Sequence, residues 1–179
     1  MELKTEDDLF ELPNSDERHE LVAGFIVAEP LPSPLHDQVR QRLFLRIHEF
    51  VAARKLGKVF FATGFKLSVS PDTVRGPDFA FVRGERLSGH NLLRFIPGAP
   101  DLAVEVLSPT NRRGEILIKV AEYLHANGRL VWVIDPRRRL ATTYRSLDPP
   151  RLIAADGALE GEDVLPGFSV PLASLFSDL

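Results

Sequence analysis

The chain has 179 residues, with 22 Lys or Arg against 25 Asp or Glu, so its formal net charge at pH 7 is −3. This length predicts one domain over residues 1–179, able to bury about 70% of the surface of its unfolded chain. The lack of cysteine excludes disulfides and thiolate metal sites and fits a reducing cytoplasm. The acidic N-terminal residues do not resemble a secretory signal, and no apolar run is long enough to predict a membrane span. Because the net charge is negative, nucleic-acid binding would depend on local basic patches.

In chain order, the spacing of apolar residues predicts a mixed α/β (α+β) fold with hairpins in its N-terminal and C-terminal parts. The expected elements are a short helix before Pro13, a hairpin over 18–22 and 25–28, a helix over 35–56, a second hairpin over 59–62 and 65–69, a strand over 78–82, a buried central strand over 102–107, a helix over 110–127, strands over 130–135 and 141–145, a small β-element near 151–154 and an apolar tail over 166–176. The passage from 102 to 135 is a βαβ crossover, whose two strands should lie parallel.

Three acidic side chains lie in or beside these apolar strands: Glu20, Asp78 and Glu105. A buried carboxylate must be paired, protonated or bound to a metal, because an unpaired buried charge costs several kcal/mol. Each acid also has an ordinary explanation. Glu20 could pair with Arg18 or Lys66, Asp78 could be a turn residue, and Glu105 could pair with an arginine or reach water at the strand end.

The helix over 35–56 begins at His36, where the positive end of the helix dipole disfavours an imidazolium. We therefore expect a neutral, hydrogen-bonded histidine, with direct catalysis as the alternative. The expected caps are Gly57 at the end of this helix, Thr110 and Asn111 at the start of the next, and Gly128 at its end.

The helix over 110–127 has two faces that helical spacing separates. Its expected buried face contains Ile116, Leu117, Val120, Ala121 and Leu124, and the opposite face contains Glu115, Lys119, Glu122 and Tyr123. From periodicity alone, Lys119 should be solvated and paired with Glu115, four residues earlier.

Several common catalytic devices are missing, including a phosphate-binding glycine loop, a Gly-x-Ser-x-Gly turn and a histidine pair at metal-binding helical spacing. What remains is a pair of carboxylates, Asp78 and Glu105, that would repel each other in a dry cleft unless a cation lay between them. Such a pair stores strain in the metal-free protein, so we expect Asp78→Asn to be at least as stable as the wild type. Oxygen ligands favour Mg²⁺, with Mn²⁺ as a substitute, and Mg²⁺ commonly serves phosphate chemistry. A nearby lysine could orient the attacking water or help to deprotonate it.

An ordered series of motifs carries a resemblance to a known family. The matching stretches are Arg18-His19-Glu20-Leu21-Val22-Ala23-Gly24, Pro32-Ser33-Pro34-Leu35-His36, Pro77-Asp78, Glu105-Val106-Leu107-Ser108-Pro109-Thr110, Lys119, Tyr123, Gly128 and Trp132-Val133-Ile134-Asp135-Pro136. Together they resemble the PD-(D/E)XK nuclease superfamily and, within it, the bacterial Uma-two family of endonucleases. The resemblance implies a restriction-endonuclease-like fold, in which a central mixed β-sheet is flanked by helices.

Three positions depart from these patterns. Leu107 stands where the superfamily has a lysine, and the Uma-two pattern takes its lysine from the following helix, where Lys119 matches it. Glu115 stands where Uma-two proteins usually have aspartate, and His19 stands where they usually have tyrosine.

The resemblance implies a Mg²⁺-dependent endonuclease that hydrolyses DNA phosphodiester bonds. Its catalytic residues would be Asp78, Glu105, Lys119 and Glu20; its metal ligands would be Asp78, Glu105 and the Val106 carbonyl; and its supporting residues would be His36, Glu115 and Tyr123. Arg112 and Arg113, just after the central strand, should contact phosphates, and double-strand cleavage would favour a homodimer. The alternatives are a catalytically silent protein of this fold that binds DNA or a protein partner, and a structural domain whose carboxylates are simply paired.

Overall fold

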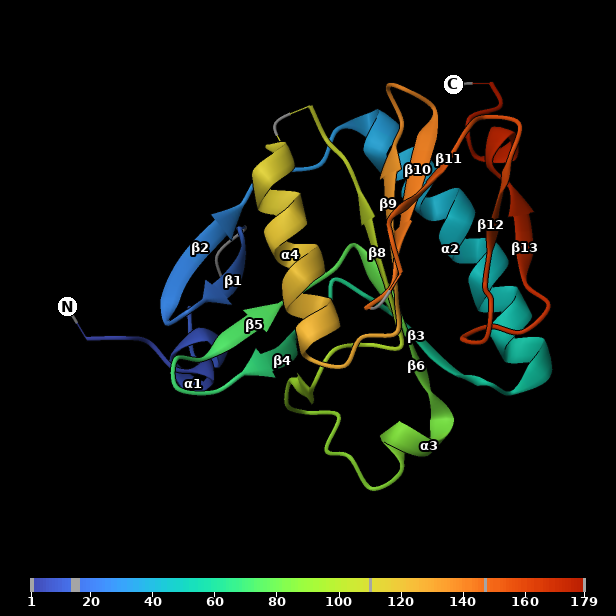
Figure 1. The fold of residues 1–179 in the computed structure, drawn as a ribbon. Coiled ribbons are helices and arrows are strands. Elements are labelled where there is room, and N and C mark those ends of the chain that lie inside the picture. The colour runs from blue at the N-terminus through green and yellow to red at the C-terminus, as the bar shows by residue number, and fades with distance from the viewer. Residues whose placement is uncertain (1, 14–16, 110, 147, 179) are drawn as a thin grey trace.

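The computed structural model describes residues 2–13, 17–109, 111–146 and 148–178. Its elements are α1 (Glu6–Phe10), β1 (Arg18–Val22), β2 (Phe25–Glu29), α2 (Pro34–Arg54), β3 (Gly57–Phe61), β4 (Phe65–Ser68), β5 (Thr73–Arg75), β6 (Phe79–Arg83), α3 (Gly84–Leu87), β7 (Ile96–Pro97), β8 (Leu102–Val106), α4 (Arg113–His125), β9 (Leu130–Asp135), β10 (Leu140–Tyr144), β11 (Arg151–Ile153), β12 (Ala158–Glu160), β13 (Ser169–Pro171) and the 3₁₀ helix η1 (Leu172–Leu175). They form a six-stranded sheet, a five-stranded sheet and a two-stranded pair (Figure 1).

The six-stranded sheet is mixed, in the order β11-β10-β9-β8-β6-β3. β8 and β9 run parallel, and the other neighbours run antiparallel. The predicted βαβ crossover is therefore confirmed as β8-α4-β9. A parallel pair needs such a crossover, because a short turn can only reverse the chain.

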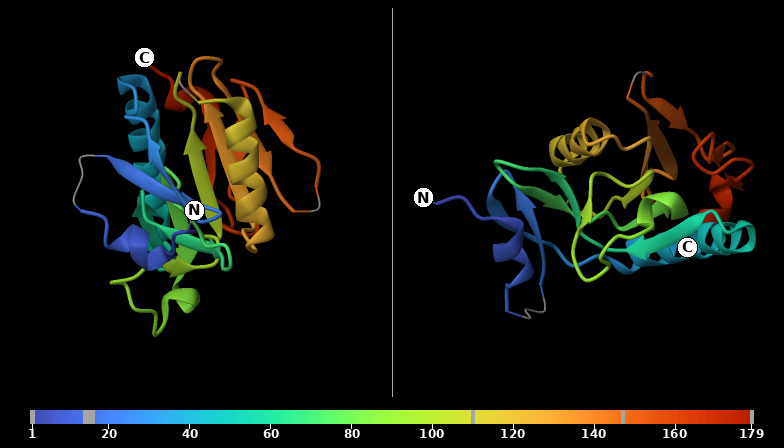
Figure 2. Two further views of the ribbon diagram at one scale, coloured as in Figure 1. Left: turned by 90° about the vertical axis from the view of Figure 1, so that its left-hand side faces the viewer. Right: turned by 90° about the horizontal axis from the view of Figure 1, so that it is seen from below.

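Helices cover both faces of this sheet, α2 on one side and α4 on the other (Figures 1 and 2). The alternation of β8 explains both contacts, since successive side chains point to opposite faces. Leu102, Val104 and Val106 belong to the core cluster that contains the buried stripe of α2, which consists of Val39, Leu43, Ile47 and Val51. Ala103 belongs to a second cluster, with Ile116 and Val120 of α4 and with Val131 and Val133. Glu105 shares the face of Ala103 and thus faces α4.

The five-stranded sheet has the order β2-β1-β5-β4-β7 and contains the predicted N-terminal hairpin, β1-β2. It lies beside α4 on the left of Figure 1, and α1 packs on it through Leu9, Leu21 and Val74. The C-terminal segment forms the predicted apolar tail, whose side chains pack on the core. Phe168, Leu172 and Phe176 are buried in the same cluster as α2. No helix in the described ranges is long and apolar enough to cross a membrane.

The mixed sheet flanked by helices confirms the predicted fold class, but the second hairpin is wrong. β3 pairs with β6 in the large sheet, whereas β4 pairs with β5 and β7 in the small one. The short connection between β3 and β4 therefore carries the chain from one sheet to the other. Gly64 in this connection lies directly against the Phe95 ring, so its lack of a side chain serves close packing as well as the turn.

Two predicted helix caps also differ. The left-handed residue that ends α2 is Lys55, and Gly57 instead begins β3. The residue at the start of α4 is Arg112, which makes no side-chain capping bond, while the Asn111 side chain accepts a hydrogen bond of 2.6 Å from the Ser108 N–H. The other predicted cap, Thr110, lies outside the described residues.

The predicted buried face of α4 is confirmed for Ile116 and Val120 and is wrong for Leu117, Lys119 and Tyr123. Lys119 and Tyr123 are buried together with Ile116 and Val120, whereas Leu117 is 43% exposed. The apolar residues of this helix form more than one stripe, and the five-stranded sheet covers the stripe that contains the lysine.

Candidate active site

Four elements bring the four predicted catalytic residues into one buried cluster. β1 carries Glu20, the segment before β6 carries Asp78, β8 carries Glu105 and α4 carries Lys119. Their exposed fractions are 1%, 7%, 5% and 7%, in that order. Charged side chains at this depth must compensate one another.

Asp78 is held in place through one of its two oxygens. Its Oδ2 accepts a hydrogen bond of 2.7 Å from the backbone N–H of Val106 and lies 3.1 Å from Nε2 of His36. Burial on its own raises the pKa of Asp78, but His36, the Val106 N–H and Arg18 outweigh burial and hold the pKa below its ordinary value. Asp78 is therefore ionised at neutral pH, and its Oδ1, which lies 4.0 Å from a guanidinium nitrogen of Arg18, is left for another ligand.

The predicted hydrogen bond of His36 is present, between Nε2 and Asp78. An ionised carboxylate only accepts hydrogen bonds, so the favourable tautomer carries its proton on Nε2, toward Asp78. The other ring nitrogen, Nδ1, is buried and has no partner among the described residues. The histidine therefore acts on the site by fixing the orientation of Asp78.

Glu105 has the most strongly perturbed environment of the acids. Burial, followed by the negative charges of Asp78 and Glu20, raises its pKa to about 7, against the opposing effects of Lys119 and Tyr123. The Tyr123 hydroxyl donates a hydrogen bond of 2.8 Å to Oε1. In return, burial and the nearby Glu105 raise the pKa of Tyr123, so the tyrosine remains a donor. The strain that the sequence predicted for Asp78 therefore falls on Glu105.

Lys119 is held between two carboxylates. Its Nζ lies 3.2 Å from Oε1 and 3.1 Å from Oε2 of Glu20, and 2.9 Å from Oε1 of Glu29. Burial on its own lowers the pKa of Lys119. The carboxylates of Glu105, Glu20 and Glu29 together raise it by more, so the pKa lies above its ordinary value. Lys119 is therefore a buried ammonium, and the predicted surface pair with Glu115 is replaced by these contacts.

Glu20 is the centre of the charge network. Its Oε2 accepts a hydrogen bond of 2.9 Å from Arg75, and its Oε1 accepts one of 2.9 Å from the Gly76 N–H. Although burial raises the pKa of Glu20, Lys119 and the other donors lower it to about 2. The predicted partner Arg18 contributes at 3.7 Å, whereas Lys66 pairs with Glu6 and Asp72 instead.

Sequence reasoning missed two members of this network, Arg75 and Glu29. Arg75 also donates a hydrogen bond of 2.6 Å to Glu122, which ties β5 to α4. A signal for Glu29 was present, because the β1-β2 register pairs it with Arg18, two residues before Glu20 and therefore on the same face. Arg75 directly precedes the Gly76-Pro77-Asp78 stretch, but nothing in its own spacing indicated a buried arginine.

The remaining predicted residues lie farther out. Glu115 is exposed, one turn before Lys119 on α4, and Arg112 and Arg113 are exposed at the start of that helix. Val106 contributes its N–H to Asp78. Since the N–H and C=O of one strand residue point to the same side, its carbonyl also faces the Asp78 side of β8.

The donor set suits a hard cation. With Asp78 Oδ2 and Glu105 Oε1 already engaged, Oδ1, Oε2 and the Val106 carbonyl remain, all of them oxygens. No group of three or more His, Cys, Asp or Glu side chains in the described ranges has the arrangement of a metal site. Two carboxylates nevertheless match Mg²⁺, which keeps several waters and takes further ligands from phosphate. Burial, with the nearby charges of Asp78 and Glu20, disfavours the ionised form of Glu105, which a bound cation would stabilise.

Comparisons with known proteins identify the family and the fold of the chain. The family described as Uma2, putative restriction endonuclease, matches residues 6–173. Among solved structures, a putative nuclease belonging to DUF820 from Anabaena variabilis ATCC 29413 superposes with a TM-score of 0.85 over 97% of each chain, at 20% sequence identity, a likeness that shows the fold. No curated protein matches the chain. The chain belongs to the Uma2 family of putative restriction endonucleases, which confirms the resemblance to Uma-two proteins.

Proposed function

We propose that this protein is a Mg²⁺-dependent endonuclease that hydrolyses DNA phosphodiester bonds, with Mn²⁺ as a possible substitute. The observation that carries the proposal is the convergence of Asp78, Glu105, Glu20 and Lys119, from four different elements, into one buried cluster with excess negative charge. Membership of a family of putative restriction endonucleases supports the nuclease class.

Asp78 and Glu105, with the Val106 carbonyl, would hold the metal. When bound, the metal would polarise the scissile phosphate and lower the pKa of a coordinated water. The protein's own contribution is to fix these ligands in advance. Val106 and His36 hold Asp78, and Tyr123 holds Glu105, so little reorganisation is needed when a substrate arrives.

Lys119 takes a narrower role than the sequence suggested. Because its pKa is raised, it holds its proton and cannot serve as a general base near neutral pH. Its ammonium can donate hydrogen bonds to the attacking water and to the phosphate oxygens that gain negative charge in the transition state. Glu20 and Glu29 position this ammonium, and Arg75 in turn positions Glu20.

We also propose that the chain acts as one domain, because Glu20 comes from the five-stranded sheet and Glu105 from the six-stranded sheet. The active unit requires both. Arg112 and Arg113 are exposed beside the C-terminal end of β8, where they are available to DNA phosphates. Cleavage of both strands would require two such sites, so a homodimer is the expected active form on duplex DNA.

The test is nicking and linearisation of supercoiled plasmid with Mg²⁺, with Mn²⁺ and with chelator. Asp78→Asn, Glu105→Gln and Lys119→Met should each lower the rate by roughly 100-fold or more, because each removes a metal ligand or a donor to the transition state. Glu49→Gln is the matched control, since it makes the same substitution as Glu105→Gln at an exposed acid of α2 and should keep wild-type activity.

Cleavage that persists in all three active-site variants, or that Glu49→Gln abolishes equally, would refute this assignment. Wild-type protein that binds DNA without cutting it in either metal would instead favour the catalytically silent alternative.

A further inference from the structure

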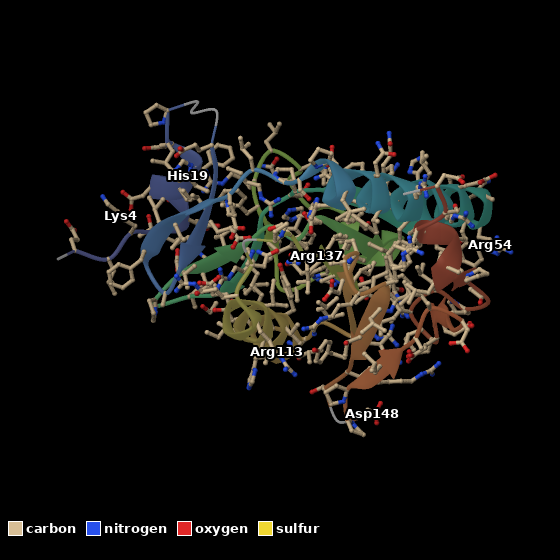
Figure 3. The ribbon with its side chains drawn as sticks, turned by 90° about the horizontal axis from the view of Figure 1, so that it is seen from above. Lys4, His19, Arg54, Arg113, Arg137 and Asp148 are labelled. Atoms are coloured by element: carbon tan, nitrogen blue, oxygen red, sulfur yellow. The ribbon has the colours of Figure 1, made fainter. Side chains whose placement is uncertain are left out.

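A basic groove lies beside the candidate active site and takes no part in the mechanism above. It has a volume of about 690 Å³ and runs between α4 and the β9-β10-β11 part of the large sheet. We call it the β10 groove; its defining residues are Arg113, Leu117, Arg137, Arg138, Tyr144 and Leu152. Figure 3 shows Arg113 and Arg137 near the middle of the molecule and Arg54 at the far end of α2.

The groove begins where the acid cluster ends. Leu107, which lines it, follows Glu105 by two residues, a distance of roughly 7 Å along a strand. Arg113 precedes Lys119 by six residues, roughly 9 Å along a helix. The groove therefore adjoins β8 and α4, the elements that carry Glu105 and Lys119.

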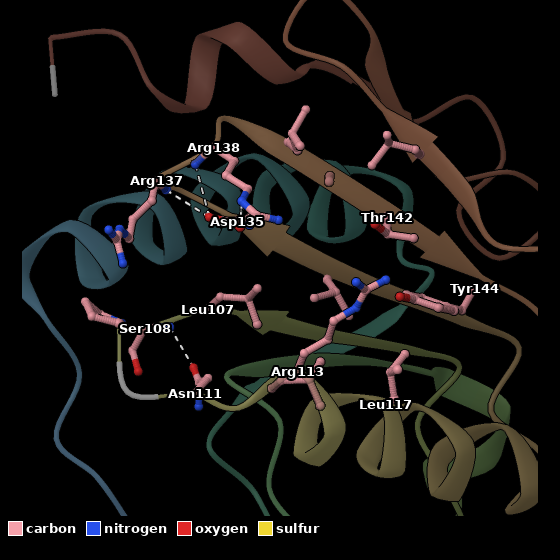
Figure 4. Close-up of a pocket in the computed structure, with 16 residues that line it drawn as sticks. Leu107, Ser108, Asn111, Arg113, Leu117, Asp135, Arg137, Arg138, Thr142 and Tyr144 are labelled. Carbon is pink, nitrogen blue, oxygen red and sulfur yellow. Dashed lines mark hydrogen bonds and ion pairs between the residues drawn. The ribbon is translucent and has the colours of Figure 1, made fainter.

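The charge of the groove favours a polyanion. Three arginines line it, and the Arg113 side chain points from α4 into the opening (Figure 4). The carboxylate of Asp135, which also lines the groove, accepts hydrogen bonds of 3.1 Å from the backbone N–H groups of Arg137 and Arg138 and lies 3.8 Å from the Arg138 guanidinium. Among the described residues, no carboxylate pairs with the guanidinium of Arg113 or Arg137.

The groove also has an apolar surface that a phosphate backbone alone would not use. Leu152 on β11 is 64% exposed, Leu117 on α4 is 43% exposed, and Tyr144 on β10 also lines the groove. Aromatic and aliphatic side chains of this kind contact the faces of unstacked bases, which duplex DNA keeps inside its stack. A second copy of the chain fits less well, because a two-fold contact through this groove would bring the arginines of both copies together.

We propose that the β10 groove binds unpaired DNA nucleotides next to the scissile phosphate, with phosphates on the arginines and bases on the apolar surface. The preferred substrate would then contain a single-stranded segment, such as an overhang or a flap. This inference rests on the proposed nuclease function, since it names the DNA that the acid cluster would cut.

Binding can be measured separately from cleavage, by fluorescence anisotropy in chelator. The probes are a labelled single-stranded oligonucleotide and a hairpin duplex of the same sequence. Arg137→Glu with Arg138→Glu should weaken single-strand binding by about 10-fold or more and reduce the salt slope by roughly 1.4, the loss of two phosphate contacts. Arg46→Glu with Arg54→Glu makes the same change in net charge at exposed positions of α2 and should weaken binding by less than about 2-fold.

A second variant tests the apolar surface. Leu152→Ser should weaken single-strand binding about 3-fold and leave duplex binding unchanged, because only unstacked bases reach this side chain. Thermal melting of each variant verifies that it is folded.

Equal losses in the two arginine pairs, or equal effects of Leu152→Ser on both probes, would overturn the inference. So would a concentration-dependent dimer that Leu152→Ser dissociates while DNA affinity stays constant, since the groove would then serve a second copy. Failure of the proposed function gives a different result: groove-dependent binding of single strands by a wild type that cuts no DNA in Mg²⁺ or Mn²⁺.

Discussion

Glu105 should make the metal-free protein lose stability as the pH rises toward neutrality. Its pKa is raised from an ordinary 4.5 to about 7, first by burial and then by Asp78 and Glu20. The folded protein thus binds this proton more tightly than the unfolded chain. The resulting stabilisation is complete below about pH 4.5 and is lost as the pH rises through about 7. The interval corresponds to a loss on the order of 3 kcal/mol.

Glu105→Gln removes the titrating group at nearly constant shape and keeps an acceptor for Tyr123. In chelator at pH 8, the variant should be more stable than the wild type, and the advantage should shrink toward pH 5. Asp78→Asn is the matched control with the opposite expectation. The pKa of Asp78 is lowered, so its ionised form stabilises the fold at every pH above its ordinary value, and this variant should be less stable than the wild type at pH 7.

Urea denaturation at pH 5, 6, 7 and 8 measures these differences, with the buried Trp132, the only tryptophan of the chain, as the fluorescent reporter. Other groups titrate in both proteins, so the difference between Glu105→Gln and wild type isolates Glu105. Mg²⁺ at a hundred times its dissociation constant should then stabilise the wild type by about 2.7 kcal/mol and leave Glu105→Gln almost unchanged. A constant difference across the pH range, or a Glu105→Gln protein less stable than wild type at pH 8, would refute this account of the site.

Two further predictions concern the supporting residues. Arg75→Met should lower the free energy of unfolding by about 3–5 kcal/mol, because it removes a buried partner of Glu20. The control, Arg46→Met on the exposed side of α2, should change it by less than about 0.5 kcal/mol. Equal effects of the two variants in urea denaturation would contradict the network. Tyr123→Phe removes a hydrogen-bond donor that lowers the pKa of Glu105, so the pH at which plasmid cleavage begins should move upward. The control, Tyr144→Phe, should leave the pH profile of cleavage unchanged. Coincident profiles for Tyr123→Phe and wild type would contradict this role of Tyr123.

Local sequence patterns predicted the parts of the fold that depend on local alternation. The two-residue period of β8 and the long apolar stripe of α2 are visible in the sequence, and both elements are present. The β3-β4 hairpin failed because strand pairing depends on which apolar faces meet, and β3 finds its partner in β6, far along the chain. A turn between two strands therefore indicated a reversal of the chain but not a shared sheet.

The site residues also differ in whether the sequence could predict them. Asp78 and Glu105 could be found because carboxylates in apolar strands are conspicuous. Lys119 could be identified only through the family resemblance, because α4 presents several apolar residues around its circumference and the position of the five-stranded sheet decides which stripe is buried. Arg75 lies in a three-residue strand, too short for its periodicity to indicate burial.

The charges around the cluster explain why a cation would be favourable at the proposed metal site. Ion pairs and nearby charges join five carboxylates to three cationic side chains: Glu20, Glu29, Asp78, Glu105 and Glu122 with Arg18, Arg75 and Lys119. Glu20 and Asp78 receive enough donors to lower the pKa of each, so the uncompensated charge appears at Glu105, and the pKa of Glu29 is raised as well, by burial and by Glu20. With all five acids ionised, the cluster carries two excess negative charges, which is the charge that one divalent cation supplies. Proton release from Glu105 and metal binding should therefore be coupled, and Mg²⁺ affinity should rise with pH across the range in which Glu105 ionises.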